Sequence, residues 1–159
     1  MGTRFAIQGN YGSVSAAQDC LRISAPTAGV LRLIECHITN DTDETSEMLP
    51  FSVYGVSDNG TGTAANIQNV DMDKNTLISA GAYSGFSAVY NLSGATTKSP
   101  SAPLIRESVN ILSGYHFVPV PEARPSISGG GAGGIVVRLE TAPTNTLSLS
   151  VYAIVEIEA

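Results

Sequence analysis

The sequence predicts an all-β fold, an antiparallel β-sandwich that is jelly-roll-like and has long loops and a proline-rich edge arm. Residues Leu147 to Glu158 alternate strictly in side-chain character over twelve residues, which is the period of a strand with one buried face. The other apolar runs are short and β-branched, and turn-forming residues separate them. These two patterns favour a sandwich or jelly roll over a helical fold.

Nine strands are expected along the chain, which suffices for two sheets. They span Phe5 to Tyr11, Cys20 to Ser24, Val30 to Thr39, Leu49 to Val56, Ala88 to Leu92, Leu104 to Leu112, Tyr115 to Val118, Ile135 to Glu140 and Leu147 to Glu158. Turn residues such as Ala25-Pro26 and Ser113-Gly114 interrupt the alternation between them. No segment carries a clear 3.6-residue period, so no full helix is expected. Met72 to Ala82 could form at most one short helical turn.

The 159 residues suit one domain, spanning 1–159, since a chain of this length buries roughly 70% of its unfolded surface. The segment from Ser57 to Pro103 is the least regular, and it predicts a loop-rich excursion from the sandwich. Loops on a rigid sheet scaffold often carry recognition. Tyr83, Phe86 and Tyr90 are therefore candidate contacts with a neighbouring chain, with core packing as the alternative for each aromatic ring.

A proline-rich stretch, Pro119 to Pro125, cannot form a central strand because its prolines lack the donors that a ladder requires. It predicts an extended edge or arm. An arm lying across an adjacent subunit would contact it through Tyr115, Phe117, Pro119 and Arg124, with Arg124 as an anchoring ion pair. A local crossover between the sheets is the alternative.

Charge and hydropathy exclude several classes of function. The net charge is -6, and the eight Lys and Arg residues are scattered, so direct nucleic-acid binding is not expected. No segment approaches eighteen apolar residues, and polar residues interrupt the first apolar stretch. We therefore expect no membrane partner and synthesis in the cytoplasm.

The sequence holds no catalytic motif. His37 and His116 are the only histidines, and no Gly-x-Ser-x-Gly elbow occurs, so we expect no enzyme and no cofactor. The two histidines are far apart in sequence and show no zinc-ligand spacing. The glycines from Gly129 to Gly134 lead into a strand rather than a helix, which indicates a turn and not a phosphate loop.

Two further clusters have structural and chemical interpretations. Cys20 and Cys36 lie on expected strands joined by residues 25–29. Their even spacing could place both side chains on the same face of a hairpin. A cross-strand disulfide fits that geometry, whereas reduced buried cysteines are the usual cytosolic outcome.

Acidic side chains follow the strand that ends at Thr39. Asp41, Asp43, Glu44 and Glu47 lack EF-hand spacing, so a solvated loop tip is expected rather than a calcium site.

Several segments together resemble a family of small β-rich structural proteins of tailed phages, which are similar to jelly-roll capsid decoration or cement proteins. The resemblance rests on Ala17-Gln18-Asp19, on Leu31 to Glu35 with its acidic loop, and on Gly114 to Pro125. Its most specific part is Pro121-Glu122-Ala123-Arg124-Pro125. The glycine-rich turn and the last two strands complete the pattern in order.

This resemblance implies a virion protein on the capsid exterior, made in the host cytoplasm, that binds the major capsid protein and stabilises the head. A symmetric homo-oligomer is expected, with a trimer preferred. A phage tail or neck protein with a carbohydrate- or receptor-binding role is the alternative, although the chain has no Trp to stack on sugars. A hydrolase is the third class considered.

Overall fold

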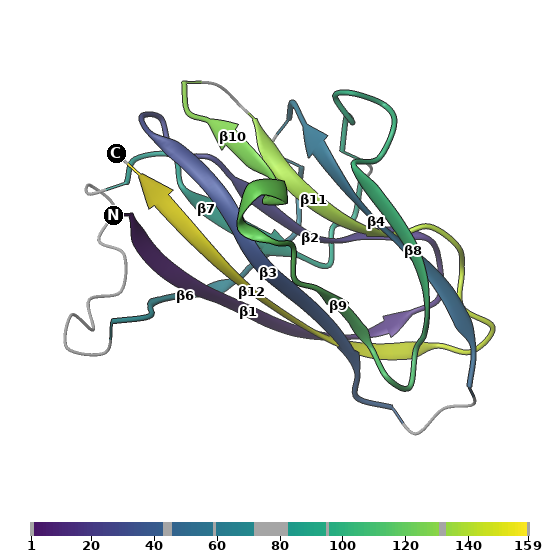
Figure 1. Ribbon diagram of the computed structural model, residues 1–159. Helices are drawn as coiled ribbons and strands as arrows, with labels where there is room; N and C mark the ends of the chain where they lie inside the picture. Colours follow the sequence, from purple (N-terminus) through teal and green to yellow (C-terminus); the bar gives the residue numbers. More distant parts are fainter. Residues whose placement is uncertain are drawn as a thin grey trace.

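The computed structural model describes residues 2–42, 46–58, 60–71, 83–94, 96–130 and 133–158. Within these residues the chain forms two antiparallel β-sheets packed against each other (Figure 1). The strands are β1 (Thr3–Val14), β2 (Gln18–Ser24), β3 (Val30–Asn40), β4 (Met48–Val56), β5 (Thr63–Ala64), β6 (Asn66–Asn69), β7 (Ser87–Tyr90), β8 (Ile105–Asn110), β9 (Tyr115–Phe117), β10 (Ser126–Ser128), β11 (Gly134–Leu139) and β12 (Leu147–Glu158), and a 3-10 turn, η2, spans Pro121–Ala123.

The first sheet has the order β10-β3-β12-β1-β6, with β9 also paired to β3, and the second has the order β5-β7-β2-β11-β4-β8. The chain passes repeatedly between the two sheets, so the predicted β-sandwich is confirmed. All nine expected strands are present, and β5, β6 and β10 are short additional ones. Met72 to Ala82 lies outside the described residues. No helix in the described ranges is long and apolar enough to cross a membrane.

Strand β12 confirms the alternation seen in the sequence. Its residues Leu147, Leu149, Val151, Ala153, Val155 and Ile157 are buried in the core. The intervening side chains lie on the outer face, which is the face turned away from the other sheet. Because β12 pairs with β1 on one side and β3 on the other, it forms the centre of the first sheet.

Cys20 and Cys36 do not lie on a hairpin, which corrects the expectation from their spacing. Strand β2 belongs to the second sheet and β3 to the first, since the connection at residues 25–29 crosses between the layers. Both cysteines are free and buried. Burial raises the pKa of Cys20 to about 11 and raises that of Cys36 further, so both remain protonated thiols at neutral pH.

A β-bulge in β2 changes which side chains reach the outer face. Leu21 pairs with Val137 and Asp19 pairs with Arg138, which leaves Cys20 as the extra residue. Cys20 and Leu21 both join the core. The bulge therefore places Asp19 on the same outer face as Arg138, where strict alternation from Leu21 would have turned it inward.

The core beneath β9 is an aromatic stack. The rings of Phe51 and Tyr115 lie parallel with centroids 5.1 Å apart, and Phe117 follows Tyr115 at 6.5 Å. Phe51 belongs to the second sheet and Tyr115 to the first, so the stack joins the two layers. The Tyr115 hydroxyl is buried and has no hydrogen-bond partner among the described residues.

Replacing Tyr115 with Phe is expected to raise the free energy of unfolding by about 1 kcal/mol, because it removes a buried polar group that forms no bond. The shift in denaturant midpoint at constant slope measures the effect. Tyr54→Phe is the matched control: the Tyr54 hydroxyl donates to Glu140 Oε1 at 2.5 Å, so this change should destabilise the protein. A Tyr115→Phe variant less stable than wild type would contradict the prediction.

Candidate functional site

A buried cluster of charged side chains lies on the outer face of the second sheet and centres on Asp19, which is 1% exposed. Lys98 Nζ donates to both carboxylate oxygens of Asp19, at 2.8 and 2.9 Å. Arg138 Nη1 donates to Oδ1 at 2.9 Å. The backbone N–H and the hydroxyl of Thr96 donate to Oδ2 at 2.9 and 2.6 Å. One buried carboxylate therefore gathers two cations and two further donors.

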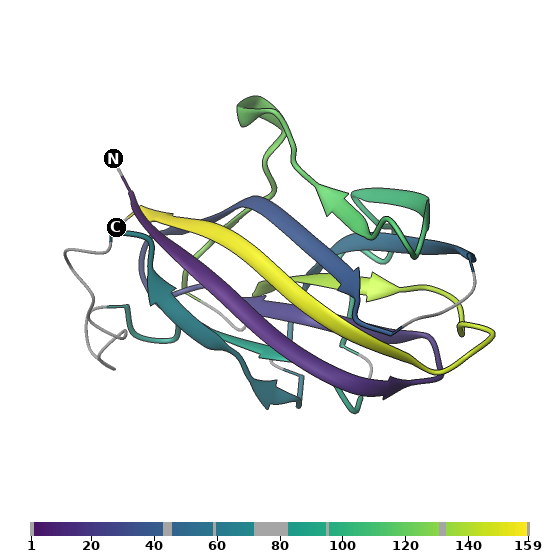
Figure 2. The same cartoon turned by 90° about the horizontal axis from the view of Figure 1, so that it is seen from below.

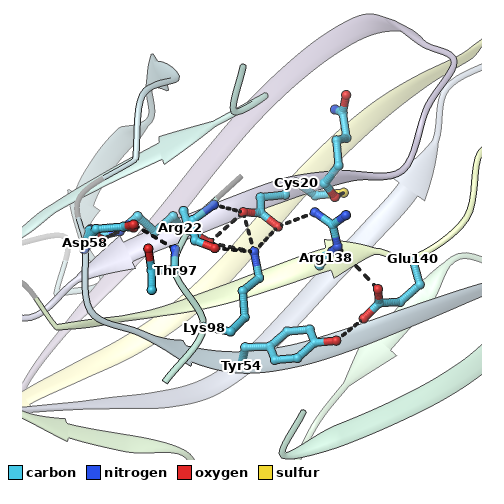
Figure 3. Close-up of polar contacts among 11 residues, drawn as sticks. Cys20, Arg22, Tyr54, Asp58, Thr97, Lys98, Arg138 and Glu140 are labelled. Atoms are coloured by element: carbon cyan, nitrogen blue, oxygen red, sulfur yellow. Dashed lines mark hydrogen bonds and ion pairs between the residues drawn. The ribbon is translucent and has the colours of Figure 1, made fainter. Parts of the chain in front are cut away.

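The cluster continues along the sheet from Arg138 (Figure 3). Arg138 Nε donates to Glu140 Oε2 at 3.3 Å, and the Tyr54 hydroxyl donates to the other oxygen of Glu140. We call Asp19, Lys98, Arg138 and Glu140 the ionic cluster. Burial alone would raise the pKa of Asp19, but the bonds from Lys98, Thr96 and Arg138 together outweigh burial, and the pKa lies below its ordinary value.

A second buried cation lies beside the ionic cluster. Arg22 is 0% exposed, its Nε donates to the Asp58 carbonyl oxygen at 2.7 Å, and its Nη1 contacts the Ser24 hydroxyl. The Asp58 carboxylate accepts from the Thr97 N–H at 2.7 Å. These bonds hold residues 57–58 and 96–98 against the outer face of the sheet. Arg22 and the ionic cluster therefore anchor both ends of the irregular segment from Ser57 to Pro103.

An apolar groove opens where β4 approaches the chain around β10. We call it the edge groove; its volume is about 680 Å³, and it is lined by residues 53–55, 99–100, 102–104, 122–127 and Ile135. Leu104 on its wall is 59% exposed. Residues 118–125, the Pro-rich loop, contain η2 and stand away from the two sheets, as the green coil in Figure 2 shows. Val118 and Val120 on this loop are 60% and 63% exposed.

Arg124 is the cation that lines the edge groove. Its Nε is buried and has no hydrogen-bond partner among the described residues. Arg4, Arg32, Lys98 and Arg138, in contrast, form ion pairs with carboxylates. No carboxylate in the described part of the chain pairs with Arg124, and a partly desolvated guanidinium of this kind is suited to bind a carboxylate of another molecule.

Three of the seven expected contact residues belong to the core, which corrects the prediction that their side chains form a contact surface. Tyr115 is 0% exposed, Phe117 is 4% and Phe86 is 8%. Phe86 packs against Phe5 with ring centroids 5.4 Å apart. The sequence pattern could not separate these cases, because an aromatic residue in a strand or loop has the same pattern whether it fills a core or a partner's pocket.

The other four are half-buried. Tyr83 packs edge-on against Phe5 and donates from its hydroxyl to Thr3 Oγ1 at 2.7 Å. The ring of Tyr90 covers Gly9, where an added Cβ would lie only 2.3 Å from the ring. Both are thus occupied within the chain. Pro119 and Arg124 lie on the Pro-rich loop, where a role in contact remains a prediction.

Of the acidic residues expected at a loop tip, the structure describes Asp41 and Glu47. Asp43 and Glu44 lie outside the described residues. Asp41 accepts from Asn10 Nδ2 at 2.8 Å and from the Ser150 hydroxyl at 2.5 Å. Glu47 accepts from the N–H and the hydroxyl of Thr144. Each described carboxylate therefore joins two parts of the fold.

Sequence reasoning missed the proximity of His37 and His116. The strands β3 and β9 pair so that these two residues lie directly opposite each other. Their side chains share the outer face of the first sheet. Only the register of a long-range strand pairing creates this neighbourhood, so a search for short ligand spacings could not find it.

Comparisons with known proteins add no assignment, since no known protein family and no curated protein matches this chain. The structure establishes the class, an antiparallel β-sandwich. The role of the protein must be inferred from its own surface and from the resemblance described above, because a sandwich alone is compatible with many functions.

Proposed function

We propose that this chain is a structural protein of a tailed-phage virion, a decoration or cement protein that binds the major capsid protein on the outside of the head and stabilises the shell. The sequence resemblance supplies the phage context. The observation that carries the surface-binding role is the edge groove, where largely apolar walls lie beside the Nε of Arg124, which has no hydrogen-bond partner among the described residues.

The groove combines apolar side chains with Arg124 as its one cation, and Glu122 is the other charged residue in its lining. The centres of protein interfaces combine apolar side chains with Arg and exclude most other charges. Leu104, Val118 and Val120 are all more than half exposed near one edge of the sandwich. Burying one such side chain fully would contribute about 1.5 to 3 kcal/mol. A carboxylate of the capsid protein would pair with Arg124 and orient the bound segment.

Repetition would turn a modest contact into stable attachment. A shell presents the same site many times, and a symmetric oligomer of this chain, with a trimer preferred, would engage several sites together. Linked contacts of this kind gain roughly 10² to 10⁴ in avidity. The net charge of -6 suits an exterior position, because an acidic protein is repelled by packaged DNA.

A carbohydrate-binding role on a tail or neck receives less support. Sugar-binding sandwiches present aromatic faces for stacking. Phe86 is buried, and Tyr83 and Tyr90 are packed within the chain. These contacts reduce the ring area that the three residues could offer to a sugar, although Tyr83 and Tyr90 each still line a surface pocket.

Purified phage particles provide the first test. Quantitative mass spectrometry should find this chain at a fixed lattice fraction of the major capsid protein. A few copies per particle would instead indicate a tail or vertex component, and absence from particles would overturn the proposal.

A binding assay with shells that lack the protein tests the groove itself. Arg124→Ala is expected to weaken binding at least tenfold, since it removes a partly buried charge contact. Arg4→Ala is the matched control, because Arg4 is 55% exposed and pairs with Glu156 within the chain; it should bind as wild type does. Equal binding by the Arg124→Ala variant would remove the groove from the interface.

A further inference from the structure

Two histidines converge on the outer face of the first sheet. His37 on β3 lies opposite His116 on β9, their ring centroids are 4.8 Å apart, and their Nδ1 atoms are 2.6 Å apart. The side chain of His37 is 25% exposed, and His116 is exposed. The pair is therefore preorganised by the sheet and accessible from solvent.

The other two ring nitrogens each face an oxygen of the protein. His116 Nε2 lies 2.9 Å from the carbonyl oxygen of Ser113. A carbonyl can only accept, so this contact assigns the proton to Nε2 and leaves a lone pair on His116 Nδ1. In the neutral pair, His37 Nδ1–H then donates to that lone pair. His37 Nε2 faces Glu35 Oε2 at 3.7 Å.

We propose that His37 and His116 bind a first-row transition-metal dication, with Zn²⁺ as the simplest case, through their two Nδ1 atoms. Imidazole nitrogen is a preferred ligand of Zn²⁺ and Cu²⁺. Metal-binding histidines usually donate their second N–H to a carbonyl or a carboxylate; here the Ser113 carbonyl accepts from His116 Nε2, and the Glu35 carboxylate lies 3.7 Å from His37 Nε2, close enough to accept after a small movement.

The proton balance is simple. Binding requires the proton on His37 Nδ1 to leave, and His37 Nε2, which faces Glu35, takes up one proton through solvent. No net proton is released from the neutral pair. Zinc–nitrogen bonds of about 2.05 Å in a tetrahedral arrangement separate the two nitrogens by about 3.3 Å. The rings must therefore move apart slightly, which the accessible His116 side chain permits.

Water would complete the coordination. No group of three or more His, Cys, Asp or Glu side chains within the described ranges is arranged to hold a metal, so the site offers two protein ligands and exchanges its ion readily. A bound ion would join β9 to β3 at the start of the Pro-rich loop. This proposal stands independently of the proposed virion function.

Calorimetric titration of the full chain with Zn²⁺ tests the proposal. Wild type is expected to bind one ion per chain at this site, and His37→Gln and His116→Gln should each weaken binding at least tenfold. Tyr152→Phe is the matched control, since the Tyr152 ring lies 5.8 Å from that of His37 on the same face; its affinity should be unchanged. Wild-type affinity in either His variant would overturn the proposal.

Nuclear magnetic resonance of the ring nitrogens provides a readout that does not depend on the variants. Addition of Zn²⁺ should move the Nδ1 signals of both histidines together, while His116 Nε2 keeps its proton and His37 Nε2 gains one. A shift of the Nδ1 signal in only one ring, or a metal-induced shift at His116 Nε2 of the size seen at a metal-bound nitrogen, would contradict the paired Nδ1 geometry.

Discussion

Replacing Asp19 with Ala is expected to lower the free energy of unfolding by about 3 to 5 kcal/mol. Asp19 is 0% exposed at its side chain and pairs with Lys98 and Arg138, whose side chains are only 15% and 23% exposed. Removing the carboxylate leaves two poorly solvated cations without their shared partner, and breaking a buried pair from one side has an effect of that size. Thr96 also loses the acceptor of two hydrogen bonds.

Equilibrium unfolding in urea at neutral pH measures this loss. Arg4→Gln is the control, because its pair with Glu156 is 55% exposed at Arg4 and exposed pairs contribute about 0 to 1 kcal/mol. A loss in the Asp19→Ala variant no larger than in the control would mean that the ionic cluster contributes little to stability.

The decrease in the free energy of unfolding at acidic pH tests the role of Asp19 independently. The folded-state pKa of Asp19 is lowered below its ordinary value near 3.8. Its contribution is therefore fully present above that ordinary value and is lost as the pH falls through the lower, folded-state pKa. Wild type should lose stability in that acidic window, and the Asp19→Ala variant should lose less of it. An equal decrease in both proteins would contradict the lowered pKa.

Phe51→Ala is expected to reduce the free energy of unfolding by about 3 to 5 kcal/mol, the usual effect of truncating a fully buried Phe. Phe51 is 0% exposed and supports the Tyr115 ring from the opposite sheet. The resulting cavity lies directly under β9, so the amide protons of Tyr115–Phe117 should exchange faster with solvent than those of β12.

Leu112→Ala is a suitable control, since Leu112 is 55% exposed and such positions usually change stability by less than about 0.5 kcal/mol. Exchange that accelerates equally in β9 and β12 would show that the aromatic stack supports the whole sandwich rather than β9 locally.

The strands were predictable because their information is local. Alternation over Leu147 to Glu158 reports burial directly, and the structure follows it residue by residue. The partners of a strand are not local information. The connection between β2 and β3 looks like a hairpin turn in sequence, but the strands separate into different sheets, which misplaced Cys20 and Cys36.

The polar sites depended on features without a sequence signature. The bulge at Cys20 reverses the orientation of Asp19, and this reversal creates the ionic cluster. The pairing of β9 with β3 creates the histidine pair. The proline-rich stretch was correctly excluded from the centre of a sheet, but it forms a loop with the 3-10 turn η2 between β9 and β10 rather than an extended edge or a crossover between the sheets. Its aromatic neighbours Tyr115 and Phe117 nevertheless turned inward, since β9 contributes its alternate residues to the core.

The position of β12 has a consequence for biosynthesis. This strand lies between β1 and β3, and its ten-residue registers with each neighbour join the beginning of the described chain to its end. A nascent chain that still holds Leu147–Glu158 in the ribosomal tunnel has two unpaired strand edges where the centre of the sheet should be. The first sheet therefore cannot close before β12 emerges, and the exposed edges of β1 and β3 are the surfaces that chaperones would need to shield until then.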